Sequence, residues 1–95
     1  MSDAPAAGAA PASPGARLRR AREARGWTAS QVAELMRLQV AVIESLEADR
    51  YDSLGAAVFV RGHLRRYGLL LDIPVGPLLE AYDRGAPLPP PTAAD

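Results

Sequence analysis

Apolar side chains recur along this chain at the spacing of α-helices rather than with the alternation typical of β-strands. The period predicts helices at residues 15–25, 39–48, 56–71 and 75–84, and a further short helix that follows Thr28. The pattern is clearest in the longest of these segments, where apolar residues recur at i, i+4, i+7 and i+11, namely Val60, Leu64, Tyr67 and Leu71. The sequence therefore predicts an all-α fold of five helices without strands.

Capping signals mark the ends of the first two helices. Ser13, followed by a proline at the first helical position, is typical of an N-cap, and Gly26 is typical of a left-handed C-cap. Thr28 and Gln31 have the spacing of a capping box. Trp27 stands directly before this box, and we expect it to pack on the second helix as a hydrophobic staple.

The two ends of the chain differ in composition from its centre. Residues 1–13 are almost entirely Ala, Pro, Gly and Ser, and residues 86–95 contain three consecutive prolines. Because such segments bury too little apolar surface to offset the entropy of ordering them, we expect disordered tails at both ends. The 95-residue chain is therefore expected to hold one helical domain at residues 14–85, followed by a Pro-rich tail or linker.

Opposite charges are segregated along the chain, although its formal net charge is zero. Residues 17–37 hold six arginines and two glutamates, whereas residues 44–52 hold four acids and one arginine. The acidic segment overlaps a predicted polar turn at residues 49–55. Such segregation favours charged partners of either sign. The arginines at positions 17, 19 and 20 suit a phosphate or anionic-lipid contact or, in the simpler interpretation, a solvated helix face.

The sequence offers no chemistry for catalysis or for holding a cofactor. It has no cysteine, a single histidine at His63 and no nucleophile motif, so we expect no enzyme activity, metal or cofactor. No signal peptide is expected at the start of the chain. The most apolar stretch, residues 68–79, is interrupted by Asp72, Pro74 and Pro77, so we do not expect this chain to insert into a membrane by itself.

Two segments resemble known protein families. Short second and third helices joined by a tight turn are typical of a helix-turn-helix. The chain resembles the lambda-repressor-like (XRE-type) superfamily at residues 16–23, ARLRRARE, and at Gly26, Ala33, Ile43, Leu46 and Glu47. Residues 59–67, FVRGHLRRY, resemble the fourth helix of the cytoplasmic domain of the RodZ family of bacterial cell-shape proteins. The resemblance implies a five-helix lambda-repressor-like domain that lies in the cytoplasm, binds the actin-like filament protein MreB and precedes a linker and one transmembrane helix.

The RodZ resemblance also implies a set of partner-binding residues. It assigns filament contact to Phe59 and His63, which are one helical turn apart, with Arg66 one turn further and Arg37 at the end of the second helix. Many family members carry Tyr or Phe in place of His63, so the apolar anchor is weaker here. The alternative interpretations are ordinary core packing for Phe59 and an uncommitted surface side chain for His63.

DNA binding by the third helix is the alternative function, that of a small transcriptional regulator. The residues expected to face the major groove are Gln39, Val40, Ala41 and Ser45, together with Glu44. Only Gln39 carries a base-reading amide, and we expect that amide to be occupied as an N-cap. Glu44 would face phosphates, which are normally contacted by Lys or Arg. The sequence therefore favours a protein partner over DNA, and leaves self-association as a third hypothesis.

An ion pair between Arg22 and Glu47 is implied by the superfamily resemblance, in which an Arg of the first helix and a Glu at the end of the third commonly pair. The alternative is two independent surface charges.

Overall fold

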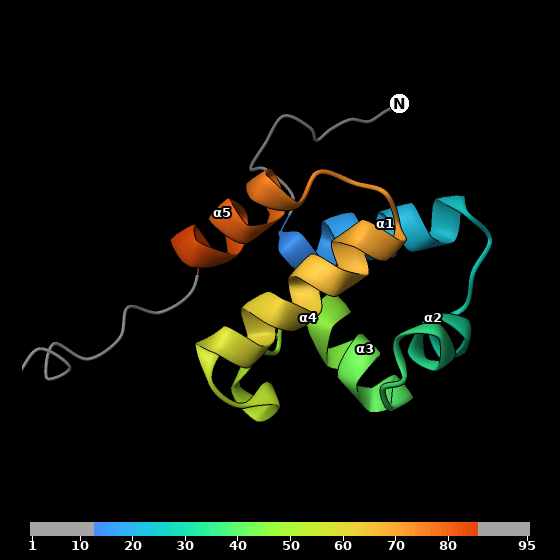
Figure 1. Cartoon of the computed structure of the whole chain (residues 1–95), viewed down its shortest axis with the longest axis horizontal. Coiled ribbons are helices and arrows are strands. Elements are labelled where there is room, and N and C mark those ends of the chain that lie inside the picture. Colours follow the sequence, from blue (N-terminus) through green and yellow to red (C-terminus); the bar gives the residue numbers. More distant parts are fainter. Residues whose placement is uncertain (1–12, 86–95) are drawn as a thin grey trace, which may run out of the picture.

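The computed structural model describes residues 13–85 of the chain, and within that range it contains five α-helices, one short 3-10 helix and no strand (Figure 1). The elements are α1 (Pro14–Ala24), α2 (Ala29–Met36), α3 (Val40–Glu47), η1 (Asp52–Leu54), α4 (Ala57–Leu70) and α5 (Val75–Gly85). The predicted all-α class is confirmed, and the four helices for which both ends were predicted agree within one residue at each end. The predicted tails, residues 1–13 and 86–95, lie outside the described residues except for Ser13.

The predicted caps of the first two helices are confirmed. The hydroxyl of Ser13 accepts a hydrogen bond at 3.1 Å from the N–H of Ala16, the third residue of α1. Gly26 follows α1 with a left-handed φ of 72°, which glycine adopts without steric cost. At the start of α2, the hydroxyl of Thr28 accepts from the N–H of Gln31 at 3.1 Å, while the side chain of Gln31 accepts from the N–H of Thr28 at 2.7 Å.

Two details of the connections differ from the prediction. Gln39 stands at the N-cap position of α3, but its side chain makes no capping hydrogen bond, so the expectation that its amide is occupied there is wrong. Its side chain is longer than those of Ser, Thr, Asp and Asn, which fit the capping geometry best. The predicted polar turn at residues 49–55 contains the short helix η1, in which the N–H of Leu54 donates to the carbonyl of Tyr51 at 3.0 Å.

The core lies between α4 and the helices that surround it. In Figure 1, α4 crosses the centre of the molecule in front of α1, and α4 packs on both α1 and α5. Helix α3 packs on α1 and α2 and completes the set of helices around the core. The inner face predicted for α4 is buried, as are Leu18, Val32, Ala33, Met36, Ile43, Leu46, Leu78 and Tyr82 of the other helices. Leu79 of α5 is partly buried and packs against this core. Within residues 13–85, no helix has the length and apolar character needed to cross a membrane.

A buried ion pair joins α1 to α3. Arg22 donates to both carboxylate oxygens of Glu47, from Nε at 2.7 Å and from Nη2 at 2.9 Å, and the two side chains are only 12% and 8% exposed. Arg22 also donates from Nη1 to the carbonyl of Trp27 at 2.8 Å, and the hydroxyl of Tyr67 donates to Glu47. Burial, and then the hydrogen bond to Glu47, raise the pKa of Tyr67 above its usual value. The network therefore ties three helices together, and Arg22 and Glu47 are partners rather than independent surface charges.

Candidate functional site

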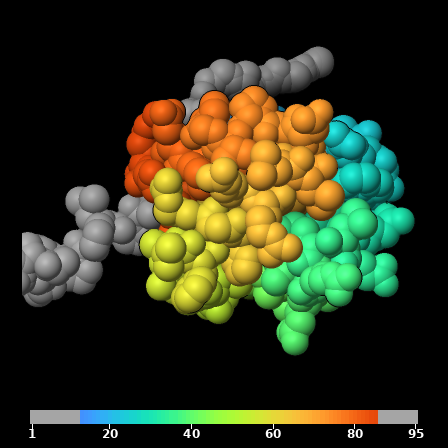
Figure 2. Space-filling model, in the orientation of Figure 1, coloured from blue at the N-terminus to red at the C-terminus, as the bar shows by residue number. Residues whose placement is uncertain are grey.

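The N-terminal part of α4 presents apolar side chains to solvent. Phe59 is 62% exposed and its neighbour Val58 is 69% exposed, so the core-packing interpretation of Phe59 is wrong. The inner face of α4 is centred on Val60 and Leu64, and the helical period turns positions 58 and 59 away from it. In Figure 2, this part of α4 (yellow) lies at the surface of the viewed face. The helix thus offers an exposed aromatic ring that the fold itself does not use.

His63 lies one turn after Phe59 and is half-buried. Burial, and then the positive charge of Arg66, lower the pKa of the imidazole below its ordinary value of 6.5. At neutral pH the ring is therefore uncharged, and it adds a neutral aromatic surface beside Phe59. The two rings come from one helix and sit at positions i and i+4, which share a face.

Arg66 has a structural contact in addition to its place on this face. Its Nη2 donates to the carbonyl of Met36 at 2.9 Å, and Met36 is the last residue of α2. This bond satisfies one of the carbonyls that a helix leaves unpaired at its C-terminus. The next residue, Arg37, is exposed and adopts a left-handed φ of 58° in the turn between α2 and α3. Arg66 therefore brings α4 against the end of α2, beside Arg37.

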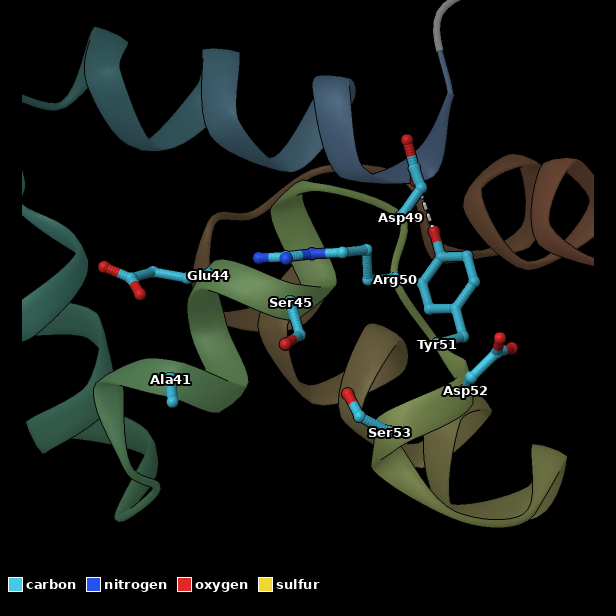
Figure 3. Close-up of a pocket in the computed structure, with 8 residues that line it drawn as sticks. All are labelled: Ala41, Glu44, Ser45, Asp49, Arg50, Tyr51, Asp52 and Ser53. Carbon is cyan, nitrogen blue, oxygen red and sulfur yellow. Dashed lines mark hydrogen bonds between the residues drawn. The ribbon is translucent and has the colours of Figure 1, made fainter.

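The outward face of α3 is small and partly acidic. Gln39, Val40, Ala41 and Glu44 are exposed, and Ser45 is half-buried. A groove of about 460 Å³ lies between this face and the segment that follows. Figure 3 shows the residues that line it, which are Ala41, Glu44, Ser45, Asp49, Arg50, Tyr51, Asp52 and Ser53. Three carboxylates line this groove against one arginine, an arrangement that repels phosphate.

Asp49 of this groove serves the fold. Its Oδ1 accepts from the N–H of Gly15 at 2.9 Å and from the hydroxyl of Tyr51, the contact drawn as a dashed line in Figure 3. Burial raises the pKa of the Tyr51 phenol, and the hydrogen bond to Asp49 raises it further. Glu44 and Asp52, by contrast, are exposed and face solvent. The acidic character of the groove therefore comes from one structural carboxylate and two free to act on a ligand.

Three exposed apolar residues were not singled out by the sequence as surface features. They are Leu35 of α2, which is 57% exposed, Val58, and Leu69 of α4, which is 61% exposed. A signal was present for Leu35, because Val32, Ala33 and Met36 already fill the inner face of a two-turn helix. Val58 precedes the first inner-face residue of α4 by two positions, which places it on another side of the helix.

A comparison with protein families identifies the type of domain. Residues 17–78 match a family model described as a helix-turn-helix domain. The matched range runs from the first turn of α1 into α5, and so includes both helices of the motif and the exposed start of α4. No solved structure matches the chain.

Proposed function

The chain belongs to the helix-turn-helix domain family, and from that premise we propose that it is a RodZ-type interaction module that docks an actin-like filament protein of the MreB class in bacterial cell-shape maintenance. The single observation that carries this proposal is the exposure of Phe59 at the start of α4. An aromatic ring that is exposed to water does not stabilise the isolated domain. Burial of that ring in a complementary pocket of a partner would stabilise the complex.

The docking surface that we propose is the face of α4 that holds Phe59, His63 and Arg66, continued by Arg37. Aromatic and arginine side chains are enriched among residues that dominate binding energy in protein interfaces. Arg66 is held by its contact with α2, so it loses less side-chain entropy on binding than a free arginine does. His63 supplies less apolar surface than the Tyr or Phe of related domains, so Phe59 is the principal anchor.

DNA binding is the second candidate, and the helix-turn-helix geometry itself is the observation that favours it. In its support, the amide of Gln39 is not used as a cap and is free to read a base edge. Against it, Val40 and Ala41 provide no hydrogen-bonding side chain, and Glu44 places a negative charge where a phosphate would approach. The protein-docking function therefore fits the exposed surfaces better.

The test is filament co-sedimentation with purified MreB-class protein, comparing wild type with the double variant Phe59→Ala, His63→Ala. Loss of the ring anchor should weaken binding at least 10-fold, since truncation of an interface anchor costs about 2 kcal/mol or more. Both side chains lie outside the buried core, so the thermal unfolding temperature should change little. Circular dichroism melts of each variant check that condition.

Leu69→Ala is the matched control, because it also removes an exposed apolar side chain from α4 but lies ten residues, or about 15 Å along the helix, from Phe59. It should leave filament binding unchanged. A folded double variant that co-sediments as well as wild type would refute the proposal. Equal losses for the double variant and Leu69→Ala would also refute it, because binding would then reflect general stickiness rather than an α4 anchor.

A further inference from the structure

A second surface, separate from the face of α4, lies where the start of α5 meets α1. It is a groove of about 280 Å³ lined by Arg17, Arg20, Ile73, Pro74, Pro77 and Leu78. Its lining combines four apolar residues with two arginines that lie one helical turn apart on α1. The first turns of α5 lie beside α1 in Figure 1, and the two helices are in contact. The fold thus combines an apolar groove lining with positive charge from α1.

The lining of the groove contains no acid. On the same helix, Arg19 is paired with Glu23 at 3.2 Å. Arg20 is exposed and forms no ion pair with any residue of the described part of the chain. Arg17 donates from Nη1 to the carbonyl of Pro77 at 3.4 Å, a long hydrogen bond that joins α1 to the first turn of α5.

The start of α5 adds to the positive electrostatic potential at the groove. Helix α5 is 11 residues long and has no acidic residue in its first turn. Pro74, which precedes it, has no side-chain oxygen that could cap the first N–H groups of Val75 and Gly76. This end carries the positive pole of the helix dipole to the groove that Arg20 also lines. Arg20 and the helix end together favour a negatively charged occupant.

We propose that this groove binds an acidic peptide segment of a partner protein, one in which an aliphatic side chain is flanked by carboxylates. The aliphatic side chain contacts the apolar lining residues Ile73 and Leu78. One flanking carboxylate pairs with Arg20 and another lies at the start of α5. The groove has a volume of about 280 Å³, large enough to accept an inserted aliphatic side chain, which the flat surface of a bilayer does not supply. Phe59 does not line it, so this proposal stands apart from the docking of a filament by α4.

The experiment is an NMR titration of the full ¹⁵N-labelled chain with a synthetic peptide, acetyl-Glu-Glu-Leu-Glu-Glu-amide. We expect saturable shifts of the backbone amides of Ile73, Gly76 and Leu78, and little change in those of α3. The peptide with alanine in place of leucine and the peptide with glutamines in place of the glutamates should each bind at least 5-fold more weakly. Added salt should weaken the binding of the original peptide, because the carboxylate contacts are exposed to screening.

Two variants and one control locate the site. Arg20→Gln should weaken peptide binding about 5-fold, whereas Arg65→Gln, which removes an equally exposed arginine from α4, should have no effect. Pro77→Asp places a carboxylate in the groove and in the first turn of α5, where an acid favours the helix. It should abolish peptide binding while leaving the domain folded.

Three outcomes would overturn the proposal. The first is a peptide affinity that Arg20→Gln and Arg65→Gln lower equally. The second is shifts that map to a surface other than this groove. The third is absence of saturable peptide binding. Vesicles of 30% phosphatidylglycerol in phosphatidylcholine that then bind the chain, and lose that binding in Arg20→Gln, would assign the groove to a membrane surface instead.

Discussion

Gly15 lies where the start of α1 meets the end of α3. A Cβ built there would lie 2.4 Å from the carbonyl oxygen of Glu47 and 2.5 Å from that of Leu46. Both atoms belong to backbone, so neither can move aside as a flexible side chain would. The N–H of Gly15 also donates to Asp49 at 2.9 Å, and this bond fixes the same contact.

We therefore predict that Gly15→Ala lowers the free energy of unfolding by about 1–3 kcal/mol, the usual cost of overpacking a tight contact. Urea denaturation followed by circular dichroism measures it. Gly62→Ala in α4 is the control, since a Cβ there meets nothing within 4 Å and alanine favours a helix interior by about 0.5–1 kcal/mol. A Gly15→Ala variant as stable as wild type would show that α1 and α3 can separate without cost.

His63 makes the stability of the domain depend on pH. Burial, and then Arg66, lower its pKa in the folded state below 6.5, the value of an unperturbed histidine. The unfolded chain therefore binds more protons than the folded chain once the pH falls below about 6.5. The stabilising contribution of neutral His63 is fully present above that pH and is lost as the pH falls through the folded-state pKa.

The prediction is that wild type loses more of its free energy of unfolding than His63→Gln between pH 7.5 and pH 5. Because both proteins share their carboxylates, the difference between the two curves isolates the histidine. Urea denaturation at several pH values gives the free energy of unfolding of each protein as a function of pH. NMR titration of the imidazole gives the pKa of His63 directly. Parallel curves, or an imidazole pKa above 6.5, would contradict the assignment.

At the scale of helices, the buried pair of Arg22 and Glu47 is the main polar connection between α1, α3 and α4. Replacing Glu47 with alanine leaves a largely buried guanidinium without its carboxylate and removes the acceptor of the Tyr67 hydroxyl. We expect this change to cost about 3–5 kcal/mol, the range for removing one partner of a buried pair. Glu23→Ala, which breaks the exposed pair with Arg19, should cost less than about 0.5 kcal/mol.

Chemical denaturation of the two variants makes the comparison, and Glu47→Gln extends it if Glu47→Ala does not fold. The glutamine keeps an acceptor for Arg22 and Tyr67 but removes the charge, so its stability should lie between those of wild type and the alanine variant. Equal stabilities for Glu47→Ala and Glu23→Ala would mean that water replaces the buried carboxylate at no cost.

The helices could be predicted from the sequence because their period and caps are local properties. Val60, Leu64, Tyr67 and Leu71 define one face of α4 whatever surrounds it, and the Ser13 cap needs only the first turn of α1. Gln39 marks the limit of this reasoning. The period of the apolar residues in α3 places Gln39 at the N-cap position. The direction of its long side chain depends on neighbouring residues in the fold, which the local sequence does not specify.

The exposed surfaces were harder to predict, because they depend on how the helices pack. The spacing of Phe59 and His63 shows that they share a face, but only the packing of α1 and α5 on α4 decides whether that face is covered. The contact of Arg66 with Met36 joins positions thirty residues apart. The groove beside Arg20 likewise combines α1 with the start of α5, and no motif in the sequence connects those two segments.

At the scale of the whole molecule, the segregation of charge along the chain becomes a segregation of surfaces. Four arginines lie on α1, where Arg19 pairs with Glu23 and Arg22 with Glu47, while acids gather beside α3. A helix-turn-helix that reads DNA needs the opposite arrangement, with positive charge around its third helix. The distribution of charge therefore directs anionic partners to the α1–α5 side and away from the helix that would enter a DNA groove.

A final prediction follows from this distribution. Removing the two exposed acids, in the variant Glu44→Gln, Asp52→Gln, should raise affinity for random duplex DNA several-fold, because each carboxylate repels phosphate at the face of α3. Fluorescence anisotropy with a labelled duplex at 50 and 150 mM salt measures the change. The matched control, Glu80→Gln, removes an acid of α5 that lies outside the α3 groove and should leave DNA affinity unchanged. If wild type instead binds one duplex sequence tightly, and loses that affinity steeply with salt, then the acids do not prevent DNA binding and α3 is a reading helix after all.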